Sequence, residues 1–218
     1  ESLLGQAAES AYTKLLSQIV DLDSVERIIE SYRENIPTSI GQLNLAAVSG
    51  YSQLMARTTI TNLNLLEEII DSYLILLPKF AVELNQLAGD RYESFLSSGF
   101  RTITVNELET LTLSYRRMSE DSALMELLDL ASKKSYENRI AQSSSIADLD
   151  LLSASYHKCL PQFSEDLDRK VMPAYLRLVN ATESFDQLLA VLKFGEKNLS
   201  SFVEEIESDV IRKFSGII

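Results

Sequence analysis

The stretch Ser-Ile-Ala-Asp-Leu-Asp-Leu-Leu-Ser-Ala-Ser-Tyr, residues 145–156, decides the fold because its pattern returns throughout the chain. It ends on the pair Ser155-Tyr156, and the same pair stands at three earlier places: Ser31-Tyr32, Ser72-Tyr73 and Ser114-Tyr115. The four tyrosines are separated by 41, 42 and 41 residues. A fixed interval of this length is typical of a structural repeat.

A second set of tyrosines repeats between the first. Its members follow one another at intervals of 39, 41, 44 and 39 residues: Tyr12, Tyr51, Tyr92, Tyr136 and Tyr175. The two series together account for all nine tyrosines in the chain. We interpret them as core residues with tethered hydroxyls, one in each helix of a repeated helical pair.

Apolar residues before each Ser-Tyr pair recur with the three-residue steps of an amphipathic helix, which we term helix A. In the fourth copy they are Ile146, Leu149 and Leu152. A residue suited to cap a helix N-terminus precedes each copy: Asp21, Asn62, Thr104 or Ser145. Proline stands five residues after three of the tyrosines and predicts the end of helix A: Pro37, Pro78 and Pro161. The third copy has residues 118–122 there instead, which predicts a longer turn.

Helix B carries the second tyrosine series, with a leucine eight residues before every tyrosine: Leu4, Leu43, Leu84, Leu128 and Leu167. The sequence therefore predicts an all-α protein of eleven helices, an α-solenoid of about five antiparallel helix-turn-helix repeats of ~41 residues. We expect a single domain over 1–218. It comprises an N-terminal half repeat at 1–20 and repeats at 21–61, 62–103, 104–144, 145–183 and 184–218.

The composition excludes several functional classes. The chain has 218 residues, 45% hydrophobic and 24% charged, with one Cys and one His. A disulfide scaffold, a Cys-based metal site and a His-rich site are therefore excluded. The formal net charge of −12 argues against a surface dedicated to nucleic acid or anionic lipid. No apolar run reaches the ~20 residues of a membrane span.

We find no catalytic, cofactor or metal motif. His157 and Cys159 lie two apart on one predicted helix and so point to different faces. The acidic runs at 165–168 and 204–209 lack the alternating ligands and central Gly of a calcium loop. No phosphate-binding loop or nucleophile elbow occurs. We therefore expect a protein that is not an enzyme, with no cofactor and no small-molecule substrate.

RNA binding is the alternative, because arrays of helical hairpins commonly bind RNA. Basic residues gather in the third and fourth repeats, and four of them are candidate phosphate contacts: Arg116, Arg117, Lys133 and Lys134. Acidic neighbours such as Glu120, Asp121 and Glu165 interleave with them, which weakens attraction for phosphate.

The helix A pattern, best seen in residues 148–156 and ending in Leu-Pro, resembles the repeats of organellar helical-repeat proteins. These are the pentatricopeptide, octotricopeptide and FAST-kinase-like heptatricopeptide groups. The resemblance implies a mitochondrial or plastid location and RNA binding. For an acidic member without a catalytic domain, it implies an accessory subunit of a large assembly such as ATP synthase or a mitochondrial ribosome.

The two ends of the array are the expected contact sites for other protein subunits, because both keep apolar residues where a polar cap is usual. At the first end these are Leu4, Tyr12 and Leu15. At the last end Phe214 supplies the apolar contact, and Glu204, Glu205 and Glu207 supply charge. Because the chain begins at Glu1 with a helix B that has no partner, we expect a removed leader or further residues upstream. We expect a mitochondrial location, with a soluble intracellular location as the alternative.

Overall fold

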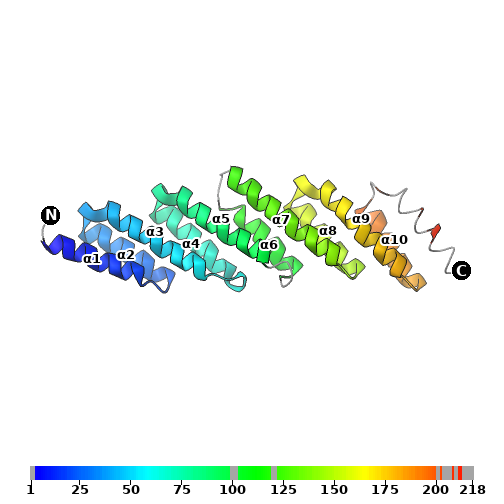
Figure 1. Ribbon diagram of the computed structural model, residues 1–218, viewed down its shortest axis with the longest axis horizontal. Coiled ribbons are helices and arrows are strands. Elements are labelled where there is room, and N and C mark those ends of the chain that lie inside the picture. The colour runs from blue at the N-terminus through cyan, green and yellow to red at the C-terminus, as the bar shows by residue number, and fades with distance from the viewer. Residues whose placement is uncertain are drawn as a thin grey trace. The chain divides into compact units, whose positions relative to one another are not determined.

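The computed structural model describes residues 3–98, 103–118, 122–199, 202, 208 and 211–212. Within these ranges the chain is all-helical and contains no strand (Figure 1). The described residues form ten α-helices: α1 (Leu3–Ser17), α2 (Leu22–Asn35), α3 (Ile40–Arg57), α4 (Leu63–Leu76), α5 (Ala81–Ser98), α6 (Val105–Tyr115), α7 (Ser122–Gln142), α8 (Ile146–Cys159), α9 (Ser164–Ala181) and α10 (Phe185–Asn198). The eleventh predicted helix, in the segment 199–218, lies largely outside the described residues.

The helices fall into two compact units. The first contains residues 1–95 and 114–125, and therefore α1 to α4 and most of α5. Within it α1 packs beside α3 and α2 beside α4, while α2 also packs against α1 and α3 (Figure 1). The predicted B helices thus contact one another in one layer of this unit, and the predicted A helices in a second layer.

The second unit contains residues 96–113 and 126–218. Within it α8 packs against α9, and α10 packs against both. The predicted A helices α8 and α10 therefore contact each other, as α2 and α4 do in the first unit.

The turns follow the predicted prolines. A single 3₁₀ turn begins at each of Pro37, Pro78 and Pro161 and leads directly into the following helix B. Proline suits this position because its φ is fixed and its missing N–H is not needed in the first turn of a helix. The third copy, without proline, has residues 116–121 between α6 and α7. Residues 119–121 of this turn lie outside the described residues.

Three of the four predicted N-caps are confirmed. Asp21 accepts from the backbone N–H of Ser24, and Ser145 from that of Asp148. Thr104 and Glu107 form a reciprocal capping box. The prediction for Asn62 is wrong: its side chain makes no cap to α4 and instead accepts from the backbone N–H of Thr59 at 2.5 Å. A 3₁₀ turn, Ile60–Asn62, precedes α4, so the chain begins to coil one turn earlier than the pattern predicts.

The tyrosines form the core, as the sequence predicts. Eight of the nine are fully buried, and Tyr12 is half-buried. In four places a helix B tyrosine meets the next helix A tyrosine edge to face, with ring centroids 6.0–6.1 Å apart: Tyr12–Tyr32, Tyr51–Tyr73, Tyr92–Tyr115 and Tyr136–Tyr156. Edge-to-face packing is a favoured aromatic geometry. The two series therefore hold neighbouring helices in a repeated register.

Candidate partner-binding surface

The first helix exposes large apolar side chains. Leu3 is 86% exposed, Leu4 83% and Leu15 50%, and Val20 after the helix is 74% exposed. Tyr12 lies half-buried beside them, with its ring against Tyr32 and its hydroxyl 2.7 Å from Ser31 Oγ. Apolar surface gathered in this way marks an interaction site on many proteins.

The other B helices show that this exposure is unusual for the position. The leucines in register with Leu4 are all fully buried: Leu43, Leu84, Leu128 and Leu167. Leu54 and Phe95, in register with Leu15, are also buried. Leu16, one helical turn after Tyr12, is fully buried, and so is its counterpart Ile140 in α7. The helix therefore packs on one side as the others do and leaves its other side open.

Repeated hydrogen bonds join each helix B to the next helix A, beginning with α1 and α2. The hydroxyl of a helix B tyrosine lies within 2.7 Å of the serine that precedes the next helix A tyrosine: Tyr12–Ser31, Tyr51–Ser72, Tyr92–Ser114 and Tyr136–Ser155. Sequence reasoning missed this bond. The serines satisfy buried phenols, whose unpaired burial costs about 1–3 kcal/mol.

The hydroxyls of three helix A tyrosines donate to a side chain of the following helix B. Each acceptor stands seven residues before the tyrosine of that helix B. Tyr32 donates to Asn44 at 2.5 Å, Tyr73 to Asn85 at 2.7 Å, and Tyr156 to Asp168 at 2.5 Å. Burial raises the pKa of Tyr32 to about 12, and it raises the pKa of Tyr51 and Tyr92 to about 12 as well. These hydroxyls therefore stay protonated well above physiological pH.

Acidic side chains form a further link between helices that sequence reasoning missed. They stand six residues before the helix A tyrosines, as Glu67, Glu109 and Asp150. Ser114 donates to Glu67, Lys158 to Glu109 at 2.6 Å, and Lys197 to Asp150 at 2.8 Å. The hydrogen bond from Lys197 lowers the pKa of Asp150, and that from Lys158 to Glu109 raises the pKa of Lys158. Their constant position, six residues before a helix A tyrosine, is the sequence signal from which these links could have been predicted.

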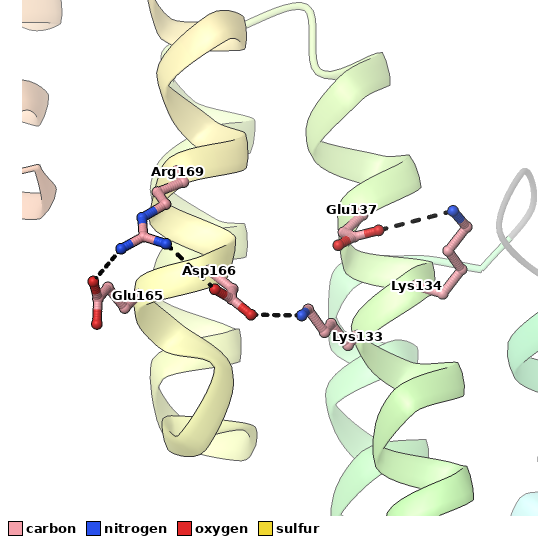
Figure 2. A network of polar contacts seen from close by, with 6 residues as sticks. All are labelled: Lys133, Lys134, Glu137, Glu165, Asp166 and Arg169. Atoms are coloured by element: carbon pink, nitrogen blue, oxygen red, sulfur yellow. Dashed lines mark hydrogen bonds and ion pairs between the residues drawn. The ribbon is translucent and has the colours of Figure 1, made fainter.

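The residues proposed to contact RNA fall in different units. Arg116 and Arg117 belong to the first unit, where Arg116 is half-buried and Arg117 is exposed. Lys133 and Lys134 belong to the second, and both are engaged by carboxylates (Figure 2). Lys133 lies 2.7 Å from Asp166 and 4.9 Å from the centre of the Phe163 ring.

Figure 2 shows how these charges are paired. Asp166 accepts from Lys133 and also faces Arg169, which in turn pairs with Glu165 at 2.5 Å, while Lys134 lies 3.9 Å from Glu137. The hydrogen bond from Lys133 lowers the pKa of Asp166. A phosphate group would have to compete with these internal carboxylates for the lysines.

His157 and Cys159 occupy different surroundings. His157 Nδ1 lies 2.8 Å from the carbonyl oxygen of Ser153, and Nε2 lies 3.4 Å from an oxygen of Asp168. Cys159 is fully buried. Both nitrogens of the imidazole therefore face groups other than the thiol.

The remaining predicted contact residues, Glu204, Glu205, Glu207 and Phe214, lie outside the described residues. In the described part of the chain, no three or more His, Cys, Asp or Glu side chains are grouped so as to hold a metal ion. No helix there is long and apolar enough to cross a bilayer.

No protein-family model and no curated protein matches the chain. One solved structure, described as "Computational Design of Self-Assembling Cyclic Protein Homooligomers", aligns over 98% of this chain and 77% of its own. The identity is 14% and the TM-score 0.18, so this likeness carries no argument about fold or function.

Proposed function

We propose that this chain is a non-enzymatic scaffold that binds other proteins within a larger assembly. We also propose that its helices form an α-solenoid of five A–B pairs preceded by one helix B. The repeated tyrosine and serine bonds support the second proposal, because they join successive helices in one register.

One observation carries the binding proposal. Leu4 is 83% exposed, whereas the leucine at the same register position is fully buried in α3, α5, α7 and α9. Burying an exposed leucine contributes roughly 1.5–3 kcal/mol. Covering Leu3, Leu4 and Leu15 with a partner therefore supplies a substantial driving force for association.

The resemblance to organellar repeat proteins adds a mitochondrial location and the role of an accessory subunit to the proposal. Fractionation of cells that express the tagged chain, with protease protection of intact mitochondria, tests the location. The tag is best placed away from α1, so that the exposed leucines stay accessible.

Copurification with crosslinking mass spectrometry tests the binding itself. Lys14 is exposed on α1, next to Leu15, and offers an amine for crosslinking. We expect protein crosslinks at Lys14 that disappear in a Leu4→Glu, Leu15→Glu variant, while crosslinks at Lys79 within the chain persist. Recovery of RNA in place of a protein partner would contradict the proposal and favour the alternative function.

A further inference from the structure

Carboxylates at one register position of the A helices differ in what pairs with them. The position lies six residues before the helix A tyrosine, and in α2 it holds Glu26. In the second unit a lysine of the following helix A neutralises the carboxylate. Lys158 lies 2.6 Å from Glu109, and Lys197 lies 2.8 Å from Asp150. These two pairs show which group the position accepts: an ammonium on a long, flexible side chain.

The first unit lacks this lysine beside Glu26. Lys158 stands two residues after the tyrosine of α8, and the residue two after the tyrosine of α4 is Ile75. Ile75 is 77% exposed, and Glu26 forms no ion pair among the described residues. The carboxylate is therefore kept, while an exposed apolar side chain stands where the lysine would be.

Glu26 occupies the same surroundings in its copy as Glu109 does in the second unit. Glu109 lies near the hydroxyl of Tyr136, which bonds a serine of the next helix A. In the same way Glu26 lies near Tyr51, whose hydroxyl bonds Ser72 of α4. Because α2 packs beside α4, Glu26 belongs to the junction of these two helices and not to the open side of α1.

Further carboxylates make this junction strongly acidic. Glu30 lies one turn after Glu26 on α2 and is exposed, and on α4 Glu67 and Asp71 have the same four-residue spacing. Side chains four residues apart share one face of a helix and are separated by about 6 Å along its axis. We define the acidic face as Glu26, Glu30, Glu67, Asp71 and Ile75.

A small hollow adjoins the carboxylates of α4. Its volume is about 80 Å³, and it is lined by Glu67, Asp71, Arg117 and the buried side chains of Tyr92 and Ser114. Ser114 donates to Glu67. Arg117 is exposed and forms no ion pair with either carboxylate among the described residues. The negative charge of α4 is therefore left without a paired cation there, like that of α2.

We propose that the acidic face binds a basic helix of a partner protein, with one lysine laid over Ile75 and its ammonium group on Glu26. A lysine stem covers apolar surface while its charged end reaches outward to a carboxylate. Lysines four residues apart on that helix match the spacing of Glu26 and Glu30. A negative surface repels RNA and anionic lipid and attracts a basic protein segment. This second surface goes beyond the proposed scaffold function and does not depend on the exposed leucines of α1.

Two fluorescein-labelled, alanine-rich peptides of identical composition serve as probes. One carries lysines four residues apart, which gather on one face of a helix, and the other carries them five residues apart, which spreads them around it. Fluorescence anisotropy measures binding of each to the full chain. We expect the first peptide to bind roughly fivefold more tightly at low salt, and the difference to shrink as salt is added. Equal affinities would overturn the proposal, because attraction to net charge alone requires no spacing.

Paired variants of the chain separate the acidic face from net charge. Glu26→Gln combined with Glu30→Gln should weaken binding of the first peptide roughly fivefold. Glu83→Gln combined with Glu93→Gln changes the net charge equally, at two exposed carboxylates of α5, and should leave the affinity within about twofold. An equal loss in the two double variants would assign the binding to net charge and overturn the proposal.

Ile75→Lys supplies the lysine that the register position lacks. We expect its ammonium to pair with Glu26 within the chain and to weaken binding of the first peptide roughly fivefold. Val82→Lys is the matched control, because it adds the same charge on α5 at a residue that is 80% exposed. Its effect should stay within about twofold. Equal effects of the two lysines would show that Ile75 does not mark the contact, and would overturn the proposal.

The results also distinguish this surface from the scaffold function. If the acidic face shows no preference in these experiments although crosslinking at Lys14 captures a protein partner, the scaffold function stands and only the inference about the acidic face is wrong. If the peptides and variants behave as expected but crosslinking captures no protein, the acidic face is confirmed as a binding surface and the proposed role of α1 is wrong.

Discussion

The hydroxyl of Tyr136 lies 2.6 Å from Oγ of Ser155, which follows it by 19 residues and belongs to the next helix. Both side chains are buried. The same bond joins Tyr51 to Ser72 and Tyr92 to Ser114. Tyr175 continues the series but meets Phe194 in place of a serine, with the two rings stacked 5.9 Å apart. Its buried hydroxyl has no hydrogen-bond partner among the described residues.

Phenylalanine substitutions at Tyr136 and Tyr175 should therefore differ in their effect on stability. Tyr136→Phe removes the partner of a buried serine and should lower the free energy of unfolding by about 1–2 kcal/mol. Tyr175→Phe removes a hydroxyl without a described partner and should be neutral or stabilising. Urea unfolding followed by circular dichroism measures both, and an equal loss in the two variants would contradict the role given to the serine.

Leucine-to-alanine substitutions at one register position test the exposure of α1. Leu84→Ala should destabilise the fold by about 2–5 kcal/mol, because Leu84 is fully buried. Tyr73→Ala should be costly for the same reason. Leu4→Ala should change the urea midpoint little, since Leu4 is 83% exposed. A large loss in Leu4→Ala would show that α1 is covered within the isolated chain.

Two glycines of α3 form another matched pair. A Cβ added at Gly50 would lie 2.6 Å from Ile19 Cδ1, so Gly50→Ala should destabilise by about 1–3 kcal/mol through overpacking. A Cβ at Gly41 would meet no atom within 4 Å. Gly41→Ala should therefore stabilise by up to about 1 kcal/mol, through reduced backbone entropy in the unfolded chain. Thermal unfolding of both variants distinguishes close packing from mere helix propensity.

Stability should decline at alkaline pH. Burial raises the pKa of Tyr51 and Tyr92 from the usual value of 10.0 to about 12. The folded state thus keeps protons that the unfolded state loses above pH 10, so this stabilisation is complete below pH 10 and falls progressively up to pH 12. Each such tyrosine should remove about 1.4 kcal/mol between pH 8 and 11.

Urea midpoints at the two pH values measure this loss, and absorbance at 295 nm follows tyrosinate formation. Tyr51→Phe serves as the control, because it should reduce the difference between the midpoints. Tyrosines of the folded chain that all ionise near pH 10 would refute the argument.

Binding to RNA should stay in the non-specific range, with a Kd no tighter than ~10⁻⁴–10⁻⁶ M at physiological salt. The reason is that Lys133 and Lys134 already face carboxylates and the chain carries a net charge of −12. Fluorescence anisotropy with mixed single-stranded RNA measures the affinity. A nanomolar Kd that weakens when Arg116, Arg117, Lys133 and Lys134 are neutralised would instead support RNA binding.

The sequence by itself determined where the helices and turns lie. Leucine eight residues before a tyrosine, proline five residues after one, and serine or aspartate at a helix start all act within a few residues along the chain. Such local constraints can be deduced without knowing any neighbour. Only the cap at Asn62 was misassigned, because Thr59 and Ile60 start a 3₁₀ turn that competes with it.

Tertiary structure alone decided what the repeated side chains do. Leu4 and Leu84 stand at the same position of the same pattern, yet one is exposed and the other buried, because burial depends on which helix lies alongside. The partners of Ser155 and Asp150 are equally invisible locally, since those bonds join residues 19 and 47 positions apart. Periodicity determines which face of a helix is apolar, and only the packing of whole helices determines what covers that face.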